Sequence, residues 1–181
     1  MRSTWIALLR GMNVGGHRIT NADLADAFAA LGFRNVGTYR ASGNVLFDAD
    51  EGDPASVTRR IERGLEAALG YAVPTFLRDA AAIHAVCAAR PFSDDALDAS
   101  PGKPQVTFLA EAPDAAARDA VLALATDDDR LAFGRRELYW LPAKGVGRSE
   151  LDHTAIARIL GQGTTRTLGT IAGIAKKLAA R

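Results

Sequence analysis

The sequence predicts an α+β protein made of two ferredoxin-like halves, each a split βαβ unit with a mostly antiparallel sheet and helices packed on it. The prediction rests on the order strand, helix, strands, helix, which occurs twice along the 181 residues. A polar stretch separates the two occurrences. We therefore expect an N-terminal half over residues 1–90, a linker over 91–103 and a C-terminal half over 104–181.

The N-terminal half begins with the apolar run TWIALL, which predicts a buried strand that leads into a glycine-rich loop. Apolar residues at helical spacing predict helices over 20–31 and 54–69, ending at Gly32 and Gly70. Between them, residues 36–47 are strand-like. Ser42-Gly43-Asn44 makes either a two-residue hairpin turn or a bulge in one long strand. A further strand is expected over 73–77.

The C-terminal half repeats this pattern after a short alanine-rich helix that Asp79 caps and that stops before Pro91. Its expected elements are a strand at 105–109, a helix at 113–125, a hairpin of 131–133 with 137–141, and a last helix at 168–178. Ser149 with Asp152 resembles a capping box that opens another helix, closed by Gly161. Residues 164–167 are expected to form a loop before the last helix.

The composition is close to that of an average globular protein. Lys and Arg number 22 against 21 Asp and Glu, so the net charge of +1 creates no global attraction to nucleic acid or membrane. The single cysteine, Cys87, excludes an internal disulfide and fits a reducing compartment, and we expect it to be a small buried helix residue. With no leader pattern and no apolar run near the ~20 residues of a membrane span, a soluble cytoplasmic protein is expected.

The glycine-rich loop has the spacing of a Walker A motif but lacks its chemistry. Gly11 and Gly16 stand at the right separation, whereas His17 and Arg18 occupy the places of the lysine and the Ser/Thr. A P-loop NTPase is therefore excluded, and no G-x-G-x-x-G motif supports a dinucleotide site. Two interpretations remain: a backbone nest for a phosphate or carboxylate, or a tight turn beside an arginine in a surface ion pair.

The sequence provides little support for metal binding, nucleophilic catalysis or paired acid/base carboxylates. The three histidines, His17, His84 and His153, lie far apart, so no metal and no cofactor is expected. No nucleophile elbow is present, and Cys87 has only His84 near it in sequence. The aspartates at 94–98 and 127–129 are expected to be solvated turn or capping residues.

A second polar constellation lies near the C-terminus. Residues 144–149 and 164–167 are rich in Gly, Ser and Thr, carry cations and lead into helices. Helix N-termini attract anions, so these segments are either part of an anion site or ordinary caps with solvated basic residues.

These motifs carry a resemblance to an uncharacterised, mainly bacterial family, the domain of unknown function DUF1697. The resemblance rests on IALLRGMNVGG, TYRASGNVLF, QVTFL, GVGRSEL and TTR, and it covers essentially the whole chain. It implies a duplicated ferredoxin-like α+β fold and brings no established reaction. The family's recurring polar positions correspond to Arg10, Gly11, Asn13, Gly15, Gly16, Ser42, Gly43, Asn44, Thr165 and Arg166. The chain departs from the pattern at His17, where lysine is common, and at Thr167 and Leu168, where Asn and Trp are usual.

The leading functional prediction is a protein that binds a small anionic ligand bearing phosphate or carboxylate, with catalysis and oligomeric state left open. Arg10 and Arg166 would hold the anion, and Asn13, Ser42 and Asn44 would orient the remainder. The predicted ligand-binding residues are Arg10, Gly11, Asn13, Gly15, Gly16, Ser42, Asn44, Arg148, Thr165 and Arg166.

The alternative prediction is a non-catalytic module that binds nucleic acid or protein. RNA binding by such a sheet requires aromatic side chains exposed on its strands. The candidates are Tyr39, Phe47, Phe108, Tyr139 and Trp140.

Overall fold

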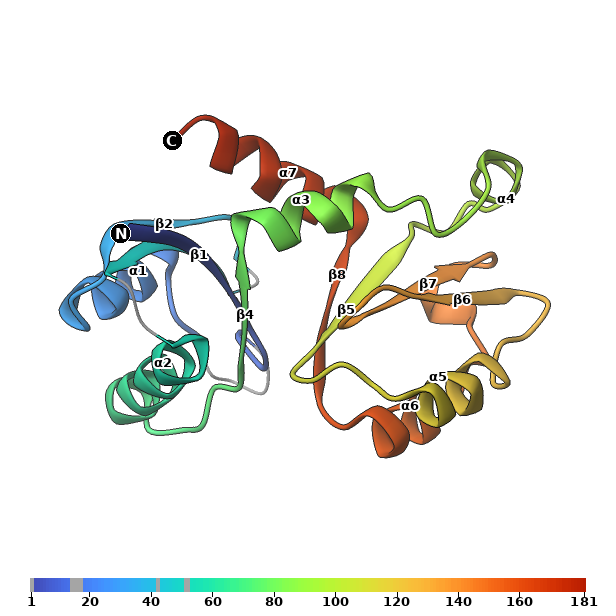
Figure 1. The fold of residues 1–181 in the computed structure, drawn as a ribbon, viewed down its shortest axis with the longest axis horizontal. Helices are drawn as coiled ribbons and strands as arrows, with labels where there is room; N and C mark the ends of the chain where they lie inside the picture. The colour runs from blue at the N-terminus through green and yellow to red at the C-terminus, as the bar shows by residue number, and fades with distance from the viewer. Residues whose placement is uncertain (1, 14–17, 42, 51–52) are drawn as a thin grey trace. The chain divides into compact units, whose positions relative to one another are not determined.

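The computed structural model describes residues 2–13, 18–41, 43–50 and 53–181. The chain divides into two compact units (Figure 1). The first comprises Met1–Ile83 with Ile174–Arg181, and the second comprises His84–Gly173.

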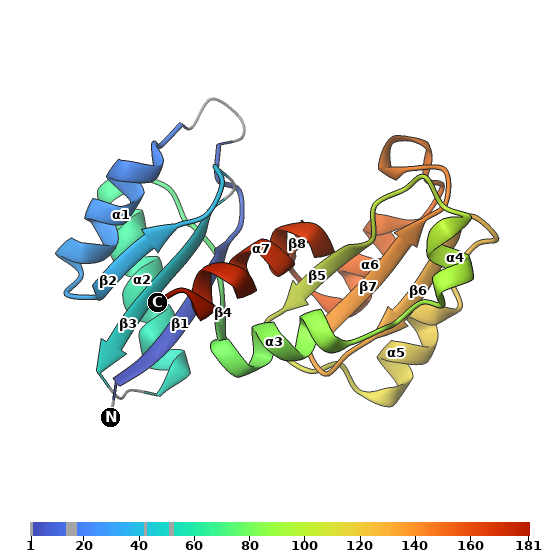
Figure 2. The same ribbon diagram turned by 90° about the horizontal axis from the view of Figure 1, so that it is seen from above.

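The first unit has a four-stranded antiparallel sheet with strand order β2-β3-β1-β4. Helices α1 and α2 cover one face of this sheet (Figures 1 and 2). In chain order the elements are β1 (Arg2–Leu9), α1 (Asn21–Ala30), β2 (Arg34–Thr38), β3 (Asn44–Asp50), α2 (Pro54–Leu69) and β4 (Thr75–Asp79), followed by α3 (Ala80–Ala88). This order and pairing are those of a split βαβ unit.

Local sequence signals account for the ends of these elements. Asp53 caps α2 by accepting the Ser56 N–H at 3.1 Å, and Gly70 ends the helix at φ 79°. The strand-like stretch 36–47 forms the two strands of an antiparallel hairpin, β2 and β3, and not one bulged strand. The connection runs over 39–43, longer than the two-residue turn expected.

An apolar core fills the space between the sheet and its two helices. Three aromatic rings lie at its centre: Phe33 packs 4.5 Å from Phe47, and Phe28 packs 5.3 Å from Phe47, measured between ring centroids. The buried residues facing them alternate along the strands and recur every three or four positions along the helices, as their periods require. They include Ala7, Leu9, Leu24, Val45, Val57, Ile61, Leu65 and Leu77.

The second unit repeats the arrangement, with an antiparallel sheet of order β6-β7-β5-β8. Helices α5 and α6 cover one face of it (Figure 1), and Val121, Trp140 and Ile156 contribute to the core there. Its elements are α4 (Asp94–Asp98), β5 (Gln105–Leu109), α5 (Ala115–Leu122), β6 (Asp129–Phe133), β7 (Glu137–Pro142), a 3₁₀ turn (Val146–Arg148), α6 (His153–Leu160), β8 (Gly163–Thr167) and α7 (Leu168–Ala179). The expected α+β class is confirmed: the chain has two four-stranded antiparallel sheets with helices, an arrangement consistent with two ferredoxin-like halves.

The junctions β4–α3 and β8–α7 show the duplication in detail. Each strand carries a buried arginine, Arg78 or Arg166, opposite an apolar residue of the neighbouring strand. The last strand residue then caps the helix that starts immediately after it. Asp79 accepts the Ala82 N–H at 2.7 Å, and Thr167 accepts the Thr170 N–H at 3.1 Å.

The units depart from the expected boundaries at two places. Residues 91–103, expected as a linker, lie within the second unit, where they form α4 and where Ser100 donates to the Pro142 carbonyl at 3.3 Å. The chain end from Ile174 lies within the first unit, where Lys177 donates to the Thr38 carbonyl at 2.7 Å.

Two local expectations are wrong. Residues 164–167 lie in strand β8, not in a loop, because they pair with β5 in register from Gln105 to Leu109. The N-cap of α6 is Asp152, which accepts the Ala155 N–H at 2.8 Å, and not Ser149. Among the described residues, no helix is long and apolar enough to span a membrane.

Candidate functional site

The segment after β1 leaves the sheet in an unusual backbone conformation. Arg10 is exposed, and its N–H donates to the Pro74 carbonyl at 2.9 Å. Gly11 has φ 75° and Asn13 has φ 58°, both in the left-handed region. Met12 between them is buried, so its side chain anchors the segment in the core. The positive φ that the glycine-rich sequence predicts is therefore present.

Asn13 joins this segment to two others. Its side-chain Nδ2 donates to the Ala41 carbonyl at 2.7 Å, and its Oδ1 accepts the Ile19 N–H at 3.0 Å. One exposed side chain thus links the end of β1, the approach to α1 and the β2–β3 connection.

The β2–β3 connection lies against the end of β1 through Gly43. The Leu9 N–H donates to the Gly43 carbonyl at 2.8 Å, and a Cβ on Gly43 would lie only 2.6 Å from Met12 Cγ. Gly43 also has φ 71°, so both conformation and space require glycine here. Arg40, two residues beyond β2, has φ 57° and is exposed.

Each of the three segments that Asn13 joins carries an arginine, and we call these residues together the Asn13 cluster: Arg10, Asn13, Arg18 and Arg40. Arg18 and Arg40 each adjoin a residue that Asn13 bonds, namely Ile19 and Ala41. All four residues are exposed. Within the described parts of the chain, no carboxylate forms an ion pair with any of the three guanidinium groups. Arg18 and Arg40 were not among the predicted site residues.

The other predicted residues of this unit fall into two groups. Gly15, Gly16 and Ser42, together with the departure at His17, lie outside the described residues. Asn44 is fully buried, and its Nδ2 donates to the Tyr39 carbonyl at 2.8 Å. The buried Asn44 amide therefore stabilises the β2–β3 connection through this hydrogen bond.

The remaining predicted residues belong to the second unit. Thr165 is exposed on β8, and its hydroxyl lies 2.7 Å from that of Thr107 on the paired strand. Arg166 is 9% exposed and donates to Thr164 Oγ1 and to the Thr165 carbonyl, both at 2.8 Å. Burial lowers the pKa of its guanidinium to about 10, so Arg166 remains cationic at neutral pH. Arg148 is exposed at the end of the 3₁₀ turn.

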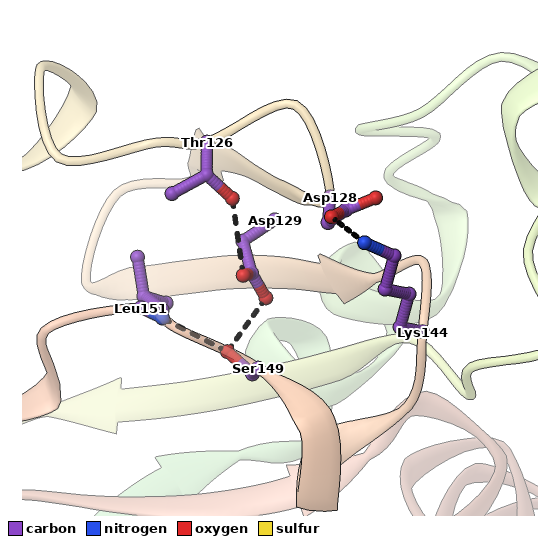
Figure 3. Close-up of polar contacts among 6 residues, drawn as sticks. All are labelled: Thr126, Asp128, Asp129, Lys144, Ser149 and Leu151. Atoms are coloured by element: carbon purple, nitrogen blue, oxygen red, sulfur yellow. Dashed lines mark hydrogen bonds and ion pairs between the residues drawn. The ribbon is translucent and has the colours of Figure 1, made fainter.

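Asp129 is the residue that the sequence interpretation missed. Expected as a solvated turn residue, it is 1% exposed. Its Oδ1 accepts from Trp140 Nε1 and Ser149 Oγ, each at 2.7 Å, and its Oδ2 accepts from Thr126 Oγ1 at 3.1 Å. Figure 3 shows Thr126 and Ser149 converging on the carboxylate.

The electrostatics of Asp129 identify it as structural. Burial alone would raise the pKa of its carboxyl, but the hydrogen bonds from Ser149, Trp140 and Thr126 outweigh burial, and the pKa is lowered. Both oxygens are occupied by donors. Beside it, Lys144 pairs with Asp128 at 2.5 Å, and Ser149 also accepts the Leu151 N–H (Figure 3). Lys144 and Ser149 therefore have structural roles in this segment.

Two further expectations fail on burial. Four of the five aromatic residues considered for RNA stacking, Phe47, Phe108, Tyr139 and Trp140, are at most 6% exposed, so they offer no stacking surface. Cys87 is exposed on α3, and not buried as expected. Among the described residues, no group of three or more His, Cys, Asp or Glu is arranged to hold a metal ion.

The fold and this geometry define a duplicated α+β protein with an arginine-rich loop cluster next to the end of β1 and the β2–β3 connection of its first unit. The chain belongs to the family described as protein of unknown function DUF1697, whose model matches residues 2–139. Among solved structures it is similar to the conserved bacterial protein SP0830 from Streptococcus pneumoniae. The two share 21% identity and a TM-score of 0.74, covering 98% of this chain and 99% of that one. This likeness concerns the fold alone. No curated protein matches the chain.

Proposed function

We propose that the protein binds a small anionic ligand, with phosphate as the anionic group, at the Asn13 cluster. The observation that carries the proposal is the convergence, through one asparagine, of three chain segments that each bring an exposed arginine. Arg10, Arg18 and Arg40 lack a carboxylate partner among the described residues. Guanidinium groups form charge-assisted, bidentate hydrogen bonds with phosphate and carboxylate oxygens, which gives this cluster a clear chemical preference.

The backbone conformation of the Asn13 cluster also supports an anion-binding site there. Arg40 adopts a left-handed conformation, which costs a residue such as arginine roughly 1–2 kcal/mol, and Asn13 adopts it at a lower cost because asparagine tolerates it. Such backbone strain gathers at binding sites, where the surrounding structure holds it in place. Asn13 holds the geometry through its two side-chain bonds, so its role is to position the arginines.

The N-terminus of α1 contributes little to this site. Thr20 caps it by accepting the Asp23 N–H at 3.1 Å, and its hydroxyl donates to the Asp23 carboxylate at 2.7 Å. The cationic side chains, and not the helix dipole, are therefore the basis of the proposal. Participation of Gly15, Gly16, Ser42, Arg148, Thr165 and Arg166 stays a prediction.

A cytoplasmic location is part of the proposal, because a single cysteine fits a reducing compartment. The alternative of a nucleic-acid module loses most of its support, since four of the five aromatic side chains considered for it are buried.

A calorimetric titration of the full chain against inorganic phosphate, sugar phosphates, nucleotides and carboxylates tests the proposal. We expect saturable binding of at least one phosphate compound, weakened at least tenfold in Arg10→Ala and weakened by added salt. Absence of binding across the panel, or equal binding by Arg10→Ala, overturns it.

A further inference from the structure

A second group of arginines lies on α2, on the outer side of the first unit. A groove of about 490 Å³ is lined by Leu31, Ser56, Arg59, Arg60, Arg63 and Gly64. The five α2 residues follow the spacing i, i+3, i+4, i+7, i+8, which places them on one face of the helix. The groove volume falls in the range of small-molecule sites, ~300–1,000 Å³.

Close contact between α1 and α2 forms the floor of the groove. A Cβ on Gly64 would lie 2.3 Å from Leu31 Cδ2, so the Leu31 side chain packs closely against the backbone of α2 at this glycine. The Leu31 side chain therefore supplies an apolar wall beside the cationic one.

The three arginines differ in how they are held. Arg60 donates to the Leu31 carbonyl and lies 4.7 Å from the centroid of the Phe33 ring, so its guanidinium is fixed. Arg59 donates to Ser56 Oγ at 2.9 Å, and Arg63 has no polar contact with any other described residue. All three arginines are exposed, and they differ in that the Arg60 guanidinium is held by a backbone carbonyl and an aromatic ring.

The lining of the groove contains three arginines and no carboxylate. Arg59 and Arg63 are one turn apart, and like charges at this spacing repel each other. Asp53 caps α2, Glu62 accepts the Thr75 N–H at 2.9 Å, and Glu66, three residues after Arg63, forms no ion pair with another described residue. No ion pair neutralises the three guanidinium groups within the described residues. A ligand with at least two negative charges would remove the repulsion.

We propose that this groove is a second anion site, which binds the pyrophosphate group of a small molecule. Two exposed guanidinium groups about 5–6 Å apart at Cβ suit two adjacent phosphate groups, and Leu31 suits an apolar portion of the same ligand. A long nucleic acid is disfavoured because the net charge of +1 provides no extended basic surface.

The test is a two-dimensional NMR titration of the full chain with inorganic pyrophosphate. We expect saturable shifts of amides in α2, and at least tenfold weaker binding in the double variant Arg59→Gln, Arg63→Gln. Both side chains are exposed, so the variant keeps the wild-type spectrum elsewhere. Arg34→Gln, an exposed arginine of β2, serves as the matched control, and Arg10→Gln separates this site from the Asn13 cluster.

Three results overturn the proposal. One is the absence of saturable shifts in α2, or shifts confined to the Asn13 cluster. Another is unchanged affinity in the double variant. The third is a response of α2 to a single-stranded oligonucleotide but not to pyrophosphate, which would assign the groove to nucleic acid.

Discussion

The side chain of Asn13 donates to the carbonyl of Ala41 at 2.7 Å, across 28 positions of sequence. The Oδ1 atom of the same side chain accepts the Ile19 N–H, so a single residue fixes the mutual positions of three segments. Asparagine suits this place because it tolerates the left-handed conformation better than most residues and offers both a donor and an acceptor.

Asn13→Gly tests the positioning role of this residue. Glycine keeps φ 58° without strain but loses both side-chain bonds. We expect weaker binding of the phosphate compound and a stability loss of about 1 kcal/mol. Asn35→Gly is the matched control, because Asn35 also has positive φ and one side-chain bond, to Asp48 at 2.6 Å. Equal effects of the two substitutions on binding would contradict the role assigned to Asn13.

Gly43→Ala tests the close approach of the β2–β3 connection to β1. Alanine adds conformational strain and a collision with Met12 and Leu9, so we expect a loss of unfolding free energy of about 2–4 kcal/mol. Gly70→Ala has the same strain at φ 79° but no atom within 4 Å of the added Cβ, and should cost about 1–2 kcal/mol. Urea unfolding measures both. A Gly43→Ala protein as stable as Gly70→Ala would refute the steric argument.

Asp129→Asn tests the buried carboxylate. An amide provides one acceptor oxygen where two are used, so we expect a loss of about 2 kcal/mol at neutral pH. Because the folded pKa lies below the ordinary value of 3.8, the ionised carboxylate stabilises the fold fully above that value. This contribution disappears as the pH falls through the lower, folded pKa.

The difference in unfolding free energy between wild type and Asp129→Asn should therefore shrink in acid. Urea unfolding at neutral pH and below pH 3.8 measures it. Asp127→Asn is the control: Asp127 is exposed, and its substitution should change stability little at either pH. A constant difference for Asp129→Asn across this range would argue against a depressed pKa.

Gly102→Ala tests whether residues 91–103 pack within the second unit. A Cβ at Gly102 would lie 1.7 Å from the Pro142 carbonyl oxygen, so the backbone must move, at a cost of about 1–3 kcal/mol. Gly147→Ala, with no atom within 4 Å, should be nearly neutral. If thermal unfolding gives equal stabilities for the two variants, the segment behaves as the flexible linker that the sequence suggested.

Much of the fold could be predicted because its signals are local. A few neighbouring residues are enough to recognise the apolar periodicity of β1 and α2. The same is true of the helix caps at Asp53 and Gly70. Strand β8 was missed since GTTRT has no apolar alternation, and only its pairing with β5 makes it a strand. Asp129 was missed for a related reason: its burial depends on Trp140 and Ser149, which the chain brings to it from later elements.

The candidate site was predictable in part. The glycines marked the positive φ at Gly11, and Arg10 and Asn13 stood beside it. Arg40 was passed over because nothing in the sequence shows that Asn13 reaches Ala41. The α2 groove has a readable signal, since Arg59 and Arg63 are one helical turn apart, but the cavity beside them depends on the packing of Gly64 on Leu31.

The most direct test of the central claim compares the dissociation constant of one phosphate compound between wild type, Arg40→Gln and Arg34→Gln. Arg34 is the first residue of β2, and Arg40 lies two residues after its end; both are exposed. Of the two, only Arg40 is next to a residue that Asn13 hydrogen-bonds, namely Ala41. We predict at least tenfold weaker binding for Arg40→Gln and wild-type binding for Arg34→Gln. Equal affinities in all three proteins would contradict an anion site at the Asn13 cluster.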